Sequence, residues 1–97
     1  MPVHYRVSRR GVAGRWVESI SLDMSSNGLC FRSRHAIPVG SHIELWLEWP
    51  ARHDDQPMEL HATGLIVRSN TYKTAIRITS RRFTVSDVEA PAIRATA

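Results

Sequence analysis

The stretch Asp23-Met24-Ser25-Ser26-Asn27-Gly28 places a carboxylate, two hydroxyl groups and an Asn-Gly pair within a single short segment. The Asp23 carboxylate can accept hydrogen bonds from N–H donors, and the Ser25 hydroxyl can either donate or accept. Alternating residues on both sides predict that the segment is a turn between two strands. Because Asn-Gly pairs favour tight turns between strands, we expect Gly28 at positive φ. The turn is the first candidate binding site.

Arginine is the second chemically informative feature. The formal net charge is +4, and twelve of the thirteen strong bases are arginine. Arginine pairs with phosphate through two parallel hydrogen bonds and stacks on flat rings, so the composition favours an anionic partner. A solvated basic surface explains the high arginine content equally well. The spacing Arg-x-x-x-Arg occurs from Arg6 to Arg10 and from Arg77 to Arg81. With so many arginines, this spacing is expected about once by chance.

Several classes of site are excluded by the composition. The histidines, at positions 4, 35, 42, 53 and 61, are widely spaced and are accompanied by one cysteine, Cys30, which argues against a metal site. The single cysteine also excludes an internal disulfide. No nucleophile-elbow pattern is present, so we do not expect an enzyme or a cofactor. We expect a cytoplasmic protein, since no apolar run has the length of a membrane span and no signal-peptide pattern opens the chain.

Six strands are needed to position these groups, and the alternation of apolar and polar residues predicts them at 3–8, 15–22, 29–33, 41–49, 58–68 and 72–79. A polar loop is expected at 50–57, and Gly64 predicts a bend inside its strand. Short connections without a helical crossover predict an all-β fold, a six-stranded antiparallel barrel in residues 1–85 with a short C-terminal tail at 86–97. The alternation assigns the core to Ile20, Leu22, Leu29, Phe31, Ile43, Leu45 and Leu47.

An Asp-x-Ser-x-x-Gly pattern between two strands resembles the signature of the bacterial PilZ domain. The resemblance covers roughly residues 3–83 and extends through the segments at 28–31, 37–40, 43–47, 64–68 and 72–78. It implies a barrel that ends in a helix, which looks truncated here, and a module that binds the second messenger cyclic di-GMP. It also implies that Asp23, Ser25 and Gly28 meet the guanine edge or a phosphate.

In the PilZ family an arginine motif binds phosphate and stacks on guanine. The resemblance therefore implies the same role for arginines near the start of this chain, and the candidates are Arg6, Arg9 and Arg10. In the family the motif precedes the first strand, whereas the strand at 3–8 would contain Arg6. Either the motif is missing from this chain, or Arg9, Arg10 and Arg15 do a similar job from the following loop. Both alternatives remain open at this stage.

Three functions are compatible with the sequence. The leading hypothesis is a cyclic di-GMP-binding regulatory module that relays second-messenger binding to a partner protein. The first alternative is a PilZ-fold protein-interaction module that does not bind nucleotide. The second is a small basic barrel that binds single-stranded nucleic acid through arginine and aromatic side chains, which we expect less than the others. The partner and the oligomeric state do not follow from the sequence.

Overall fold

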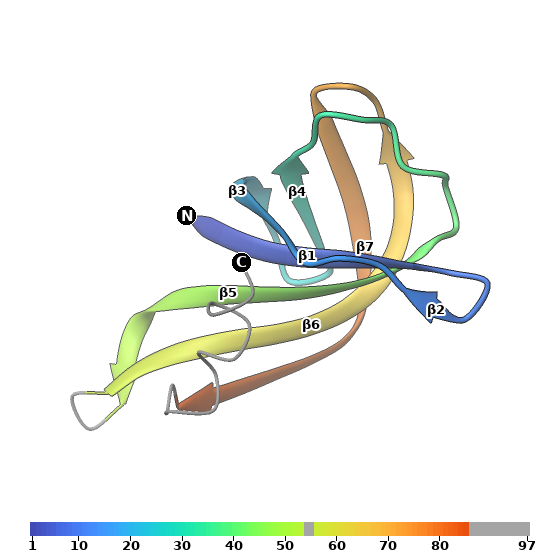
Figure 1. The fold of residues 1–97 in the computed structure, drawn as a ribbon. Helices are drawn as coiled ribbons and strands as arrows, with labels where there is room; N and C mark the ends of the chain where they lie inside the picture. Colours follow the sequence, from blue (N-terminus) through green and yellow to red (C-terminus); the bar gives the residue numbers. More distant parts are fainter. Residues whose placement is uncertain (54–55, 86–97) are drawn as a thin grey trace.

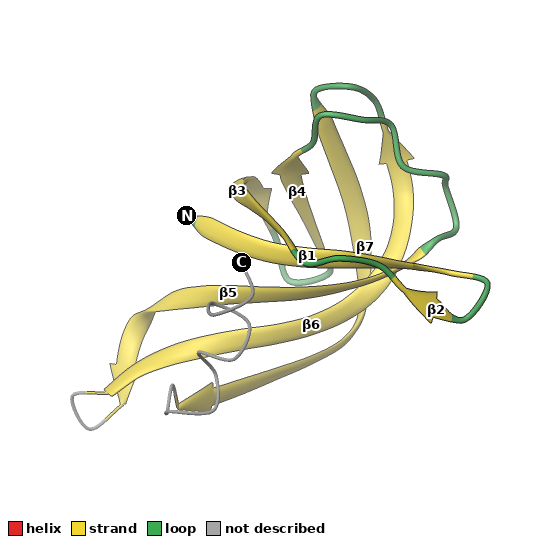
Figure 2. Ribbon diagram, viewed as in Figure 1, coloured by secondary structure: helices red, strands yellow, loops and turns green. Residues whose placement is uncertain are grey.

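The computed structural model describes residues 1–53 and 56–85, and every regular element among them is a strand (Figures 1 and 2). The strands are β1 Pro2–Arg9, β2 Val12–Ala13, β3 Val17–Met24, β4 Gly28–Arg32, β5 His42–His53, β6 Gln56–Ser69 and β7 Lys73–Val85. The predicted tail at 86–97, including its possible helix, lies outside the described residues.

Six of these strands close into an antiparallel barrel. They follow the order β1-β3-β4-β7-β6-β5, and a further pairing between β5 and β1 closes the circle. Strand β2 is an additional short strand that forms a hairpin with the end of β1. The predicted all-β barrel is therefore confirmed, with one extra strand. Closure pairs the two edges that an open sheet would leave exposed.

The core is formed by inward-facing residues of every barrel strand except β3. Ile43, Leu45 and Leu47 alternate along β5 and are fully buried, as the sequence predicts, and Leu29 and Phe31 of β4 are buried beside them. The remaining core residues are Val3, Tyr5, Leu60, Ala62, Ile66 and Ile76. The rings of Tyr5 and Phe31 pack with centroids 4.4 Å apart. Burial of this continuous apolar cluster is the main favourable contribution to folding.

Strand β3 presents the opposite face to the one the sequence predicts. Ile20 and Leu22 were assigned to the core, yet they are 49% and 47% exposed. The pairing of β1 with β3 sets Ser19 opposite the buried Val3. Residues directly opposite in an antiparallel pair share a face, so Ser19 points inward and Ile20 outward. The core assignment of Ile20 and Leu22 is therefore wrong.

The long hairpin of β5 and β6 replaces the polar loop expected at 50–57. Pairing continues through Arg52 with Pro57 and His53 with Gln56. A register shift between Trp49 and Arg52 accommodates Pro50, which has no N–H to donate to the ladder. Ladder pairing therefore outweighs the turn-forming tendency of the two prolines.

The bend predicted at Gly64 is confirmed. The register of β6 with β7 shifts between Thr63 and Gly64. A Cβ at Gly64 would collide with the backbone carbonyl group of Arg77. Glycine therefore allows β7 to approach β6 closely where the barrel wall bends.

Candidate functional site

The turn that joins β3 to β4 contains the first candidate residues. The Ser25 N–H donates to the Gly28 carbonyl oxygen at 2.9 Å, which closes the turn. One oxygen of Asp23 accepts from the Met24 N–H at 2.9 Å. The other carboxylate oxygen makes no hydrogen bond to any residue that the structure describes, and both Asp23 and Ser25 are exposed. The turn therefore presents a free acceptor and a hydroxyl to solvent.

Gly28 has a different role from the predicted one. The described residues with positive φ are Arg10, Gly11 and Gly40, so the prediction of positive φ at Gly28 is wrong. Gly28 is already part of the β4 ladder, and a Cβ there would lie 2.8 Å from a backbone carbonyl oxygen of β7. Close approach between two strands, and not a left-handed turn, is what requires glycine at this position.

Arg6 is held in a network on the outer face of the barrel. Its Nε donates to Oε1 of Glu44 at 3.0 Å, and a terminal guanidinium nitrogen lies 2.9 Å from the same oxygen. The guanidinium also lies over the ring of Trp16, 4.8 Å from the ring centroid. Both interactions fix the Arg6 head on the wall of the barrel and away from the Asp23 turn.

Arg9 and Arg10 lie at the far end of β1. Arg9 is its last residue, and Arg10 with Gly11 forms the two-residue turn to β2, with φ values of 52° and 76°. Positive φ at both positions is the signature of a type I′ hairpin turn. The start of β1 pairs with β3 next to the Asp23 turn, since the Met1 carbonyl oxygen accepts from the Ser21 N–H.

The arginines and the turn are therefore separated. At 3.3 Å or so per residue, the eight residues of β1 span about 23 Å. The hairpin that bears Arg9 and Arg10 projects from one side of the barrel in Figure 1. The structure brings Asp23, Ser25 and Gly28 together, and it brings none of the three predicted arginines to them. The positions of Arg9 and Arg10 therefore do not favour the alternative in which Arg9, Arg10 and Arg15 replace the family motif from the loop after β1.

The comparisons with known proteins decide the family. The model of the PilZ domain matches residues 1–93. The chain belongs to the PilZ domain family. No curated protein and no solved structure matches the chain. PilZ domains are regulatory modules of the cyclic di-GMP-binding type, which confirms the predicted family and the general class of function.

The PilZ turn has a cation beside it that the sequence analysis did not select. Arg77 of β7 is the direct partner of Gly28 in β4. Asp23 is the partner of Cys30, two residues after Gly28, so alternation places Asp23 and Arg77 on the same outer face. Arg77 is exposed and makes no ion pair within the described part of the chain. Its signal in the sequence was the second Arg-x-x-x-Arg spacing, which chance alone could explain.

Two further features are absent from the described part of this PilZ domain. Residues 1–53 and 56–85 contain no group of three potential metal ligands. They also contain no helix that is long and apolar enough to cross a membrane.

Proposed function

We propose that this PilZ domain is a regulatory module that acts mainly through contact with a partner protein, and that its Asp23 turn binds cyclic di-GMP only weakly. The position of β1 is the observation that supports this proposal. As an ordered barrel strand, β1 holds Arg9 and Arg10 at the end remote from the turn. Two phosphates need cations within reach, and paired hydrogen bonds from arginine are the strong anion contacts available to this chain.

An exposed apolar patch beside the turn supports the protein contact. Pro2 of β1 pairs directly with Ile20 of β3, and the Met1 carbonyl oxygen accepts from the Ser21 N–H. Leu22 follows two residues after Ile20 in β3. Met1, Ile20 and Leu22 are each more than a third exposed. Isolated apolar residues are normal on a surface, but a contiguous group is typical of contact surfaces. The patch lies next to the turn, so a partner bound there would touch both.

A second candidate function is a cyclic di-GMP receptor that uses Arg77. The pairing of Gly28 with Arg77 is the specific observation in its favour. In this candidate the Asp23 carboxylate would accept hydrogen bonds from the N–H groups of guanine. The Arg77 side chain of β7 would contact a phosphate group. One arginine replaces the several that the family motif implies, so this candidate predicts weaker binding than a complete motif would give.

Calorimetric titration with cyclic di-GMP, with GTP as the control ligand, tests the proposal. We expect no saturable heat, or an affinity weaker than micromolar. Micromolar binding that is specific for cyclic di-GMP would contradict the proposal. It would establish the second candidate if Asp23→Ala and Arg77→Gln each weaken binding while the matched charge removal Arg9→Gln does not. Micromolar binding that survives Asp23→Ala unchanged would exclude the turn as the site altogether.

A further inference from the structure

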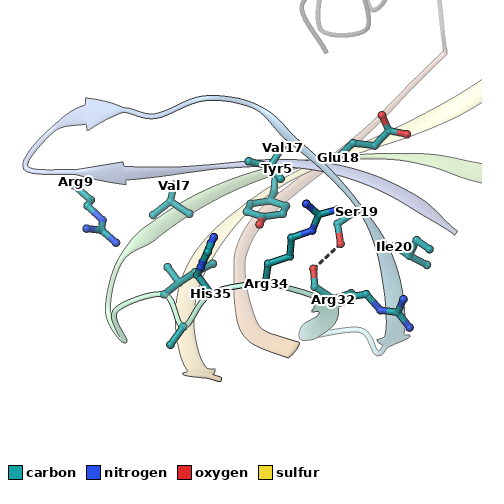
Figure 3. Close-up of a pocket in the computed structure, with 12 residues that line it drawn as sticks. Tyr5, Val7, Arg9, Val17, Glu18, Ser19, Ile20, Arg32, Arg34 and His35 are labelled. Carbon is teal, nitrogen blue, oxygen red and sulfur yellow. Dashed lines mark hydrogen bonds between the residues drawn. The ribbon is translucent and has the colours of Figure 1, made fainter. Parts of the chain in front are cut away.

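A pocket of about 790 Å³ opens where β1 and β3 diverge, and its lining includes no residue of the Asp23 turn (Figure 3). Strands β1 and β3 pair only as far as Tyr5 with Val17. Beyond Tyr5, Ser8 and Arg9 pair with β2 on this edge of β1, while the other edge pairs with β5 from Val3 to Ser8. The connection after β4 lies below the gap and supplies residues 34–37 to the lining. The volume is in the range of small-molecule sites.

The lining of this pocket combines an apolar interior with a cationic rim. Val7, Val17, Ala36 and Ile37 supply aliphatic surface next to the Tyr5 ring. The rim is basic, and its members are Arg9, Arg32, Arg34 and His35. Glu18 is the one acidic residue in the lining, and its carboxylate lies 3.9 Å from Nε2 of His4. Such a lining favours a ligand with an apolar body and a negative charge.

The arginines of the pocket lack ion-pair partners within the described structure. Arg9, Arg32 and Arg34 make no ion pair with any described residue. Tyr5 is only 8% exposed, and its hydroxyl group makes no hydrogen bond to a described residue. Figure 3 shows this hydroxyl pointing into the pocket on the side of Arg34. The Tyr5 hydroxyl is not among the buried side-chain atoms that lack a hydrogen-bond partner in the described structure, so it is accessible from the pocket and can donate to an acceptor brought by a ligand.

The ionisation of Tyr5 agrees with a donor role. Burial raises the pKa of its hydroxyl group, and the nearby Arg34 guanidinium opposes that change in part. Since the ordinary value is about 10, the hydroxyl group is protonated at neutral pH and can donate. Arg34 has further donors in a planar arrangement that matches an oxyanion. The two side chains together can therefore hold one negatively charged group.

We propose that this pocket binds a small molecule that has an apolar body and one oxyanion group, either a carboxylate or a phosphate. Arg34 and the Tyr5 hydroxyl group hold the oxyanion, and the aliphatic side chains of Val7, Val17 and Ile37 contact the body. Arg9 and Arg32 add positive potential at the rim. The lining shares Ile20 with the apolar patch but includes no residue of the Asp23 turn, so the site does not depend on the proposed weakness of cyclic di-GMP binding.

Amide-resolved NMR titration of the full chain tests the proposal with three probes that share one ring system. Naphthoate carries the carboxylate, naphthyl phosphate carries the phosphate, and naphthamide is the neutral control. We expect saturable shifts at the amides of Tyr5, Val7, Val17 and Ile37 with at least one anionic probe, and binding about tenfold weaker for naphthamide. The better anionic probe then identifies carboxylate or phosphate as the preferred group. Equal binding of naphthamide, or shifts centred on the Asp23 turn, would overturn the proposal.

Three variants separate the proposed contacts from general charge and folding effects. Arg34→Gln removes an exposed cation and should weaken the preferred anion about tenfold. Tyr5→Phe keeps the buried ring and should weaken it several-fold through loss of one donor. Arg68→Gln removes one charge from an exposed position outside the lining, and affinity should stay within about twofold. Affinity unchanged in both Arg34→Gln and Tyr5→Phe, with spectra of a folded protein, would refute the assignment.

Discussion

Replacing Leu45 and Leu22 by alanine, one at a time, tests the orientation of the two strands that contain them. Leu45 is fully buried on β5, whereas Leu22 is 47% exposed on β3. Leu45→Ala loses the whole transfer free energy of the side chain and leaves a cavity, and such changes cost about 2 to 5 kcal/mol. Leu22→Ala gives up only about half of a leucine transfer free energy and leaves no enclosed void, so we expect about 1 kcal/mol.

Urea unfolding followed by tryptophan fluorescence measures both free energies against the unsubstituted chain. If Leu45→Ala is too unstable to yield a folded baseline, Leu45→Val leaves a smaller cavity and should still cost more than Leu22→Ala. A cost for Leu22→Ala equal to or above that for Leu45→Ala would show that β3 buries Leu22. It would thereby refute the register of β1 with β3 on which the position of the arginines depends.

Three further predictions concern other parts of the barrel. Gly28→Ala should lower the unfolding free energy by about 1 to 3 kcal/mol in a thermal melt, because the new Cβ would lie 2.8 Å from a carbonyl oxygen of β7. In a Tyr72→Phe background, absorbance titration should show that Tyr5 ionises above its ordinary pKa of about 10, because burial raises that pKa. The protonated hydroxyl group then adds to the unfolding free energy fully below a pH of about 10, and this addition is lost as pH rises through the raised pKa of the folded state. Glu44→Ala, which leaves Arg6 without its partner, should cost about 1 kcal/mol in urea unfolding, and no loss would show that the pair adds no stability.

The sequence predicts strand positions better than it predicts strand faces. Along β5 the apolar set includes Leu45 and alternates with polar residues, so only one face suits the core. Along β3 the alternation of Ile20 and Leu22 with serines predicts a strand equally well, but period two shows only which residues share a face. Pairing with β1 decides which face is inside, and a shift of one residue exchanges the faces. That pairing is tertiary information.

The same limit applies to the candidate site. The Asp23 turn is local, so its sequence is sufficient to locate it between two strands. The cations beside it depend on which strands pair around the barrel, and the β4–β7 pairing that brings Arg77 to Gly28 joins residues far apart in the chain. Arg6, Arg9 and Arg10 are closer in sequence to Asp23, yet β1 directs them elsewhere. Proximity in sequence was therefore a poor guide to proximity in space.

The path of β1 determines both the distance of Arg9 from the Asp23 turn and the position of the pocket. On one edge, strand β1 pairs with β3 over Pro2 to Tyr5 and then with β2 at Ser8 and Arg9, and on its other edge it pairs with β5 from Val3 to Ser8. Arg9 is at the end of β1 that no longer pairs with β3, away from the Asp23 turn, and this position is the basis for the weak phosphate binding proposed there. The gap that β1 leaves beside β3 is the opening of the pocket, and Arg9 lies on that rim. Of the candidate arginines for the family motif, Arg9 is thus found on the rim of this pocket, where Val7 lies between it and Tyr5 (Figure 3).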